Sequence, residues 1–364
     1  NVLEDSKKPV LYIGGGIIQG NASELVLEFA DKQSLPIVST LMGLSAIPSD
    51  HPNYLGMLGM HAAPYTNYVL EECDLLIALG VRFDDRATGK VSEFCKNAKI
   101  IHVDIDQSEI GKIKIPNFSF VSDVKVFLEK LNPIIPKKQR LDWITKVNEI
   151  KEAHPLVPFF FSFQKHPLEI IKTIGLLSDP DTIVTTDVGQ HQMWVAQCYP
   201  FKKPGTWLTS GGLGTMGFGL PAAIGAAFAY PEKKILCFTG DGSLLMNIQE
   251  LDTLAEFDLN IKIIILNNGH LGLVRQQQEL FYKENFIASK YHKPADFVKI
   301  GNAFGINSFL IESDFDFESK IKTILNGNGP SLLNIPIIAE EKVFPMVPPG
   351  AANRDMILPK VQIQ

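Results

Sequence analysis

Short apolar runs alternate with helix-like stretches along this chain, and the alternation constrains its fold more than any other feature. The runs are PVLYIG, PIVST, CDLLIALG and KIIHVDI in the first half, then TIVTTD, ILCFTG, IKIIILNN and SLLNIPI. Between the first two, residues 22–33 place Leu25 and Phe29 on one helix face. Continuously apolar strands separated by helices are typical of parallel sheets covered on both sides. The pattern predicts an α/β protein with doubly wound parallel sheets.

Length and a polar interruption divide the chain into two predicted domains. The 364 residues are many for a single core, and the Pro- and Lys-rich stretch NPIIPKKQR follows the first series of runs. We assign residues 1–133 to a first domain, 134–163 to a linker with a short helix around Trp143, and 164–342 to a second domain. The proline-rich tail, residues 343–364, cannot form a regular helix and is expected to lie as an extended cover.

Composition and charge argue against several classes of function. A net charge of −6 favours neither a nucleic-acid nor an anionic-membrane partner. No window provides the roughly 20 apolar residues of a membrane span, and none resembles a signal peptide. Cys73, Cys95, Cys198 and Cys237 form no CxxC pair, which argues against a cysteine zinc site and for a reducing, cytoplasmic location. The chain enters a strand soon after Asn1, so we expect an upstream segment to be missing.

Two strands of the second half end in oxygen-bearing side chains. Asp241 stands between Gly240 and Gly242 after one run, and Asn268 ends the next. A right-handed βαβ unit brings both carboxyl ends to one edge of the sheet, where open α/β sheets bind ligands. The glycines allow close approach, and Ser243 begins a helix whose N-terminus favours an anion. Either residue alone fits a turn or a strand cap, but the pair favours Mg²⁺ with a diphosphate.

The pair also resembles a known cofactor motif. GDG followed at this distance by NN is similar to the motif of thiamine diphosphate enzymes. The segments DVGQHQMWVAQCYPF, LTSGGLGTMGFGLPAAIGAAFA, NNGHLGLVRQQQELFY and EEKVFPMVPPGAANRDM resemble the large-subunit family of acetolactate synthase, also called acetohydroxyacid synthase. The stretch TLMGLSAIPSDHPNYLGMLGMHAAPYTNYVLEECDLLIALGVRFDDRATGK resembles the FAD-binding domain of that family. The resemblance implies thiamine diphosphate, Mg²⁺ and FAD as cofactors, a homodimer or higher homo-oligomer, and a small regulatory subunit.

The resemblance implies a thiamine diphosphate site in the second half. Asp241 and Asn268 match the side-chain magnesium ligands, and His270 matches the position whose main-chain carbonyl completes the set, although its imidazole could also be read as a base. Met216 matches an apolar side chain that props the cofactor into its bent form; alone it would be ordinary core packing. The residues implied for this cofactor are Gly189, Gln190, His191, Gly214, Met216, Asp241, Gly242, Ser243, Asn268 and His270.

The case for FAD in the first half depends more heavily on the resemblance. YIGGGIIQG does not fit GxGxxG, because Gln19 stands where the last glycine should be, and a tight turn explains it equally well. Arg82 and Arg86 offer guanidinium groups suited to a pyrophosphate, although a solvated charged loop has the same composition. The positions implied for FAD are Gly14, Gly15, Gly16, Thr40, Leu41, Met42, Gly59, Met60, His61, Gly80, Arg82, Asp84, Arg86, Asp104, Ile105 and Asp123.

The reaction implied by the resemblance joins two 2-oxo acids. Pyruvate condenses with pyruvate or 2-oxobutanoate, CO₂ leaves, and 2-acetolactate or 2-aceto-2-hydroxybutanoate enters branched-chain amino-acid biosynthesis. The family's catalytic glutamate lies in an N-terminal pyrimidine-binding domain that this sequence does not match, so no catalytic residue is assigned and the chain alone is expected to be inactive.

One position departs from the family, and other functions stay open. Gln277 stands where many members carry a tryptophan beside the substrate channel, which puts the preference for 2-oxobutanoate and sulfonylurea binding in doubt. Pyruvate oxidase, glyoxylate carboligase and a non-catalytic cofactor-binding module are alternatives. The segments RFDDR and PMVPPG favour acetolactate synthase among them.

Overall fold

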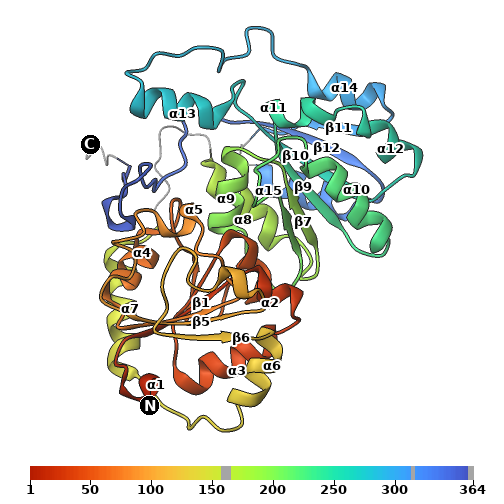
Figure 1. Ribbon diagram of the computed structural model, residues 1–364. Helices are drawn as coiled ribbons and strands as arrows, with labels where there is room; N and C mark the ends of the chain where they lie inside the picture. The colour runs from red at the N-terminus through yellow and green to blue at the C-terminus, as the bar shows by residue number, and fades with distance from the viewer. Residues whose placement is uncertain (157–164, 313–315, 360–364) are drawn as a thin grey trace. The chain divides into compact units, whose positions relative to one another are not determined.

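The chain folds into two compact units, each with its own parallel sheet (Figure 1). The computed structural model describes residues 1–156, 165–312 and 316–359. Unit 1 comprises Asn1–Val157, Phe201–Gly205 and Phe344–Gln364, and unit 2 comprises Pro158–Pro200 and Thr206–Val343.

Unit 1 contains a six-stranded sheet in the order β3-β2-β1-β4-β5-β6, and every neighbouring pair is parallel. The order reverses between β1 and β4, and the crevice at such a reversal is where open α/β sheets bind ligands. The strands are β1 (Pro9–Ile13), β2 (Ile37–Ser39), β3 (Tyr54–Met57), β4 (Leu75–Leu79), β5 (Lys99–Asp104) and β6 (Phe118–Val121).

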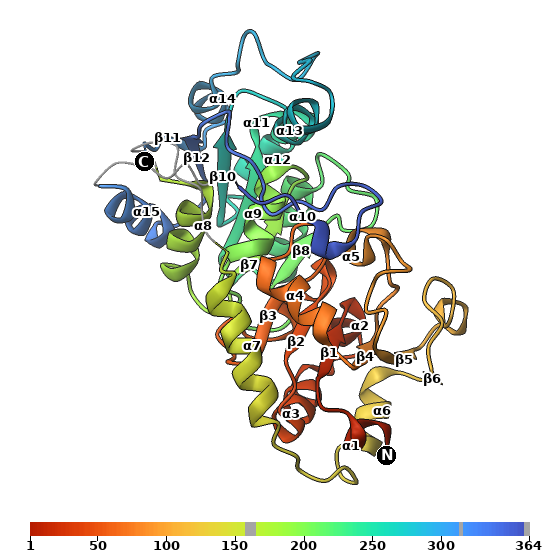
Figure 2. The ribbon, with the colours of Figure 1, turned by 90° about the vertical axis from the view of Figure 1, so that its left-hand side faces the viewer.

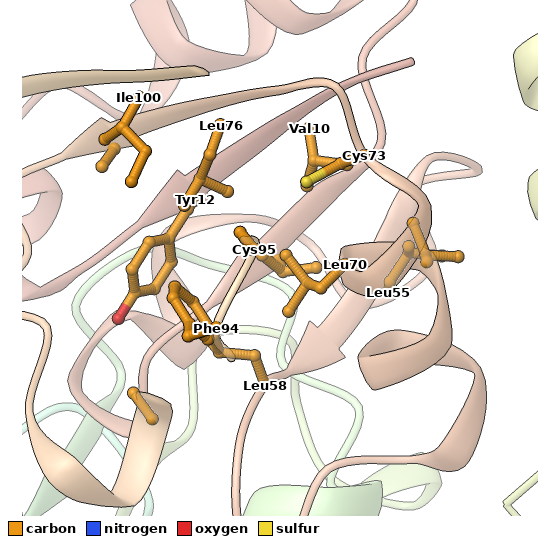
Figure 3. Packing of buried hydrophobic residues seen from close by; sticks show 14 of the residues in the cluster. Val10, Tyr12, Leu55, Leu58, Leu70, Cys73, Leu76, Phe94, Cys95 and Ile100 are labelled. Atoms are coloured by element: carbon orange, nitrogen blue, oxygen red, sulfur yellow. The ribbon is translucent and has the colours of Figure 1, made fainter. Parts of the chain in front are cut away.

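Helices cover both faces of this sheet because its central strands are apolar on both sides. Tyr12 of β1 faces a cluster that includes Trp143, whereas Leu11 faces a second cluster that includes Phe29. Figure 3 shows the first cluster, where the ring of Tyr12 lies between Leu76 and Phe94. The helical segments are α1 (Val2–Asp5), α2 (Gly15–Gln19), α3 (Ser23–Gln33), α4 (Pro64–Glu72), α5 (Asp85–Thr88), α6 (Val124–Leu131) and α7 (Leu141–Ala153), with 3₁₀ turns η1 (Leu41–Ala46), η2 (Gln107–Glu109) and η4 (Asn353–Asp355).

Residues assigned to the linker include the whole of α7, which packs beside α4 on the unit 1 sheet (Figures 1 and 2). Trp143 is buried there, and its indole N–H donates to the carbonyl of Pro9 at 3.0 Å. The tail between residues 344 and 359 has one 3₁₀ turn and otherwise runs without helix. Arg354 in that turn pairs with Glu71 at 2.8 Å, and also with Glu93.

Unit 2 contains a second six-stranded sheet in the order β11-β12-β10-β9-β7-β8, again entirely parallel. The order reverses between β7 and β9. Gly240 pairs with Leu266, so Asp241, which follows β9, and Asn267, the last residue of β10, lie at the same level. The strands are β7 (Ile183–Thr186), β8 (Trp207–Thr209), β9 (Ile235–Gly240), β10 (Ile261–Asn267), β11 (Asn307–Leu310) and β12 (Ser331–Pro336). The predicted fold class, two doubly wound parallel sheets, is confirmed.

The helix expected between β9 and β10 is broken into three pieces, which corrects the prediction of a single helix. Leu251 and Leu254 are buried in the core of unit 2, and the side-chain amide of Asn247 donates to the carbonyl of Gly217. The helical segments are α8 (Pro167–Leu176), α9 (Gln190–Cys198), α10 (Gly219–Ala229), α11 (Asp241–Leu244), η3 (Leu245–Asn247), α12 (Glu250–Glu256), α13 (Gly272–Phe281), α14 (Phe297–Ala303) and α15 (Phe317–Asn326). None of the helices in the described ranges is long and apolar enough to span a bilayer.

Candidate functional site

Three loops meet at the carboxyl edge of the unit 2 sheet, next to the reversal of strand order. They follow β7, β9 and β10 and carry residues 189–191, 241–243 and 268–270. These are three of the loops in which the sequence predicts contacts to thiamine diphosphate. Parallel strands end at the same edge, so the topology alone brings the loops together.

Specific contacts hold these loops against one another. The hydroxyl of Ser243 donates to the carbonyl of Val188 at 2.8 Å, which joins the β9 and β7 loops. The amide of Asn268 donates to Gln190 at 3.1 Å, which joins the β10 and β7 loops. A Cβ added to Gly240 would lie 3.0 Å from Nδ1 of His191, so only glycine fits there without displacing the imidazole.

Asp241 carries a buried carboxylate with one oxygen unused. The residue is 5% exposed, Oδ1 accepts from the amide of Gly242 at 2.8 Å, and Oδ2 has no partner among the described residues. Burial raises the pKa of Asp241 to about 6, although the amides of Gly242, Gly269 and His270 act in the opposite direction. An orphaned, buried carboxylate oxygen is costly, and a cation is the simplest partner that would satisfy it.

The backbone N–H of His270 faces the carboxyl group of Asp241. Segments 289–291 and 269–271 run antiparallel, and their hydrogen bonds flank the pair His270–Lys290. In such a pair the backbone N–H and C=O point away from the partner strand. The N–H of His270 instead reaches Oδ1 of Asn268 at 3.0 Å and lies close enough to Asp241 to lower its pKa. The carbonyl points to the same side, which favours a main-chain ligand over an imidazole base.

A second orphaned polar atom lies at this edge. Nε2 of His191 is buried without a partner among the described residues, and burial lowers the pKa of this imidazole to about 3, so it is neutral at pH 7. A Cβ on Gly269 (φ +66°) would meet nothing within 4 Å, and one on Gly214 (φ +67°) would meet only Cγ1 of Val188 at 3.9 Å, whereas Gly242 is crowded. A Cβ on Gly242 would meet the hydroxyl of Tyr291 at 2.5 Å, so that glycine serves packing.

The residues present fit a hard cation bound with an anionic group. No three His, Cys, Asp or Glu side chains of the described ranges cluster as a metal site. A cation at this edge would therefore depend on mixed oxygens: the Asp241 carboxylate, the Asn268 amide and the His270 carbonyl. Such oxygen ligands suit Mg²⁺, which keeps remaining positions for water and phosphate oxygens.

Asp187 is a structural residue of this edge that the sequence analysis missed. Its carboxylate is buried, and both oxygens are used: Oδ1 accepts from the amides of Val188 and Gly217, and Oδ2 accepts from the amide of Gly219. Burial raises its pKa, and these amides partly offset the rise. Asp187 thus anchors the loop that carries Met216. The signal was present, because Asp187 ends an apolar run just as Asp241 follows one.

Neighbouring glutamines of α13 differ sharply in environment. Gln277, predicted beside a substrate channel, is exposed on this helix, and its role stays a prediction. Gln276 is 1% exposed, and its side chain bonds to Gln190 at 3.1 Å.

The positions predicted for FAD follow the six strands of unit 1 and therefore share one edge of that sheet. Gly14 and Gly16 follow β1, and an added Cβ would lie 2.2 Å from the Gly80 oxygen or 2.8 Å from its Cα. These glycines thus allow the β1 and β4 loops to touch. Arg82 and Arg86 are both exposed.

Several polar FAD candidates already have structural partners. Thr40, Asp84 and Asp123 each accept a backbone N–H at the start of a helical turn, η1, α5 and α6 respectively. His61 is buried, its Nδ1 lies 3.0 Å from the carbonyl of Pro345, and burial lowers its pKa to about 4. Asp104 is also buried and accepts from a backbone amide at 2.9 Å.

Comparison with known proteins matches both units. The profile for "Thiamine pyrophosphate enzyme, central domain" matches residues 1–131, and that for "Thiamine pyrophosphate enzyme, C-terminal TPP binding domain" matches residues 187–335. The chain is 50% identical over 357 residues to the acetolactate synthase isozyme 1 large subunit of Escherichia coli (strain K12), covering 98% of this chain and 63% of that protein. It is 43% identical over 369 residues to acetolactate synthase 1, chloroplastic, of Nicotiana tabacum, covering 98% of this chain and 55% of that protein. The chain thus spans less than two thirds of these relatives' length.

Proposed function

The chain belongs to the thiamine pyrophosphate enzymes, as a relative of acetolactate synthase large subunits, and from this premise we propose that it forms the cofactor-binding part of an acetolactate synthase. The reaction proposed is condensation of pyruvate with pyruvate or 2-oxobutanoate and release of CO₂. The products are 2-acetolactate and 2-aceto-2-hydroxybutanoate, respectively. They would serve the synthesis of branched-chain amino acids.

The observation that carries the proposal is the orphaned carboxylate oxygen of Asp241. Together with Oδ1 of Asn268 and the carbonyl of His270 it offers three oxygens at one sheet edge. We propose that these residues hold Mg²⁺ and, through it, the diphosphate. When bound, thiamine diphosphate would supply the carbanion that attacks the keto carbon of pyruvate. The protein's part would be to bind and orient the cofactor, with Met216 against its rings, and to keep water out.

We extend the proposal to FAD in unit 1. Its support is the reversal of strand order between β1 and β4, with the loop carrying Arg82 and Arg86 directly after β4. Both guanidinium groups are exposed, and the pair that Arg86 makes with Asp85 at 3.5 Å lies at the surface. Guanidinium groups bind a pyrophosphate through paired N–H donors.

Assembly and location belong to the same proposal. We propose a homodimer or larger homo-oligomer in the cytoplasm, joined by a small regulatory subunit. The resemblance places the catalytic glutamate in an N-terminal domain, and no residue of this sequence matches it. The chain alone is therefore expected to bind cofactors without turning over pyruvate.

The test is to assay acetolactate formation by this chain alone and after adding the separately produced N-terminal domain of the E. coli relative. Activity should appear only in the mixture and should require Mg²⁺ and thiamine diphosphate. Consumption of O₂ with pyruvate, and no acetolactate, would indicate an oxidase instead. No binding of thiamine diphosphate at any Mg²⁺ concentration would overturn the proposal.

A further inference from the structure

Hydrogen bonds link three side-chain amides in series, the buried Gln276 and Gln190 and the half-buried candidate metal ligand Asn268, and we call this series the relay. Gln190, the first residue of α9, is 5% exposed and bonds to Asn268 on one side and to Gln276 on the other. We propose that Gln190 is a positioning residue, which fixes the amide of Asn268 so that its oxygen, and not its nitrogen, faces the metal. This inference rests on the proposed magnesium–diphosphate site.

At Gln276, the end of the relay away from Asn268, two backbone groups of Val343 fix which atom of the side-chain amide is the oxygen. The N–H of Val343 donates to Oε1 of Gln276 at 2.8 Å, and the carbonyl of Val343 accepts from Nε2 of Gln276 at 3.0 Å. A backbone N–H can only donate and a carbonyl can only accept, so the Gln276 amide has one allowed orientation. The atom of Gln190 that contacts the oxygen of Gln276 must therefore be a hydrogen-bond donor.

The orientation of the Gln276 amide in turn fixes the orientation of the Gln190 amide. Its Nε2 donates to Oε1 of Gln276 at 3.1 Å and to the carbonyl of Glu341 at 2.8 Å. Two acceptors on that side leave Oε1 of Gln190 as the atom that faces Asn268. Oε1 accepts from Nδ2 of Asn268 at 3.1 Å, so the nitrogen of the Asn268 amide is directed away from the metal site.

The near end of the relay imposes the same orientation. The backbone N–H of His270 donates to Oδ1 of Asn268 at 3.0 Å, and this N–H also lies beside the carboxyl of Asp241. The terminal torsion of an asparagine is broad and roughly two-fold, so without partners its oxygen and nitrogen would exchange places. An exchanged amide would present N–H groups to a cation. The relay prevents that exchange.

The backbone of Gly272 packs closely against the hydrogen bond between Gln190 and Asn268. A Cβ added to Gly272 would lie 2.0 Å from Oε1 of Gln190 and 2.8 Å from Nδ2 of Asn268, so the start of α13 packs directly on their hydrogen bond. Both the nitrogen and the oxygen of the Gln190 side chain are thus bonded to other residues of the protein. Any contact between Gln190 and a diphosphate would come from its backbone, which refines the role implied by the resemblance.

The decisive variant is Gln190→Met, which keeps the length of the side chain but removes both of its hydrogen-bonding groups. Gln192→Met is the matched control: Gln192 lies in the same helix, is also buried, and donates to Thr209 at 2.8 Å without touching the relay. Groups that orient metal ligands are typically worth about 10- to 100-fold in metal affinity. We therefore expect Gln190→Met to raise the Mg²⁺ concentration for half-saturation at least about tenfold.

The experiment titrates Mg²⁺ into the chain with fixed thiamine diphosphate, followed by calorimetry, and records the melting temperature without metal. Gln190→Met should weaken Mg²⁺ binding far more than Gln192→Met while both change the metal-free melting temperature similarly. In an Asn268→Ala background, Gln190→Met should add no further loss, because it acts through Asn268.

Equal Mg²⁺ affinity for Gln190→Met and wild type would overturn the inference, and so would an equal loss in Gln192→Met. A wild-type chain that binds no thiamine diphosphate would instead overturn the proposed function itself. The two failures are therefore distinguishable by the wild-type titration alone.

Discussion

Replacing Asp241 by asparagine should stabilise the metal-free protein and abolish Mg²⁺-dependent cofactor binding. Burial raises the pKa of Asp241 from 3.8 to about 6. An acid whose pKa rises on folding destabilises the fold above that pKa, and the effect vanishes below the unfolded value of 3.8. A shift of roughly two units is worth about 3 kcal/mol at pH 8. Burying the extra N–H₂ of asparagine costs about 1–2 kcal/mol, which leaves a net gain of about 1–2 kcal/mol.

The assay is calorimetric unfolding in EDTA at several pH values. For a unit of this size the gain corresponds to a rise in Tm of roughly 2–8 °C at pH 8. Toward pH 5 the penalty on the buried carboxylate falls by about half, because Asp241 is then mostly protonated, so the net gain of the variant should shrink to about zero. Adding Mg²⁺ and thiamine diphosphate should stabilise wild type and leave Asp241→Asn unchanged. A lower Tm for the variant in EDTA at pH 8 would refute the reasoning.

Asp187→Asn provides the contrast within the same sheet edge. Asp187 is as buried as Asp241, but both of its oxygens accept backbone N–H groups. Asparagine would turn a donor toward one of those amides, so unit 2 should lose about 1–3 kcal/mol with or without metal. If both variants stabilise the protein, the distinction between a satisfied and an orphaned carboxylate is wrong.

Three further predictions concern the two cofactors and the substrate. Protons should compete with Mg²⁺ for Asp241, so the Mg²⁺ affinity of the wild type, measured by titration, should fall about tenfold per pH unit below about 6. Asp241→Asn should bind Mg²⁺ too weakly to show this trend. A wild-type Mg²⁺ affinity that does not change with pH would contradict the prediction. Arg82→Ala or Arg86→Ala should weaken FAD binding, followed as quenching of flavin fluorescence, and a wild-type chain that stays colourless with added FAD would rule out a flavin site. With the N-terminal domain added, Gln277→Trp should raise the preference for 2-oxobutanoate over pyruvate, because a fitted pocket gains about 1–3 kcal/mol per methylene; an unchanged product ratio places Gln277 away from the acceptor.

The sequence predicts the interior of both sheets but none of their edge strands. The eight apolar runs correspond to β1, β2, β4, β5, β7, β9, β10 and β12, whereas β3, β6, β8 and β11 were missed. Each missed strand is the outermost strand of its sheet. Interior strands are covered on both faces and must be continuously apolar, but an edge strand needs no such pattern. All four residues of β6 are exposed, and β8 has only three residues.

In the candidate site, too, some features could be predicted from the sequence and others could not. Asp241 and Asn268 could be predicted because a strand end between glycines, and a pair of asparagines at another, mark a sheet edge. The partners of Gln190 could not, because Gln276 and Glu341 approach it from distant parts of the chain. The free oxygen of Asp241 and the satisfied oxygens of Asp187 likewise look the same in sequence. Only the packed backbone distinguishes the candidate ligand from the structural anchor.

The most direct test of the central claim is a crystal structure of this chain with Mn²⁺ and thiamine diphosphate, with the metal located by its anomalous scattering. The account predicts one peak at the carboxyl edge of the unit 2 sheet. It should lie about 2.1–2.3 Å from the Asp241 carboxylate, Oδ1 of Asn268 and the carbonyl of His270, with diphosphate oxygens completing the octahedron. A metal bound elsewhere, or a diphosphate bound at this edge without a metal contact to Asp241, would contradict it.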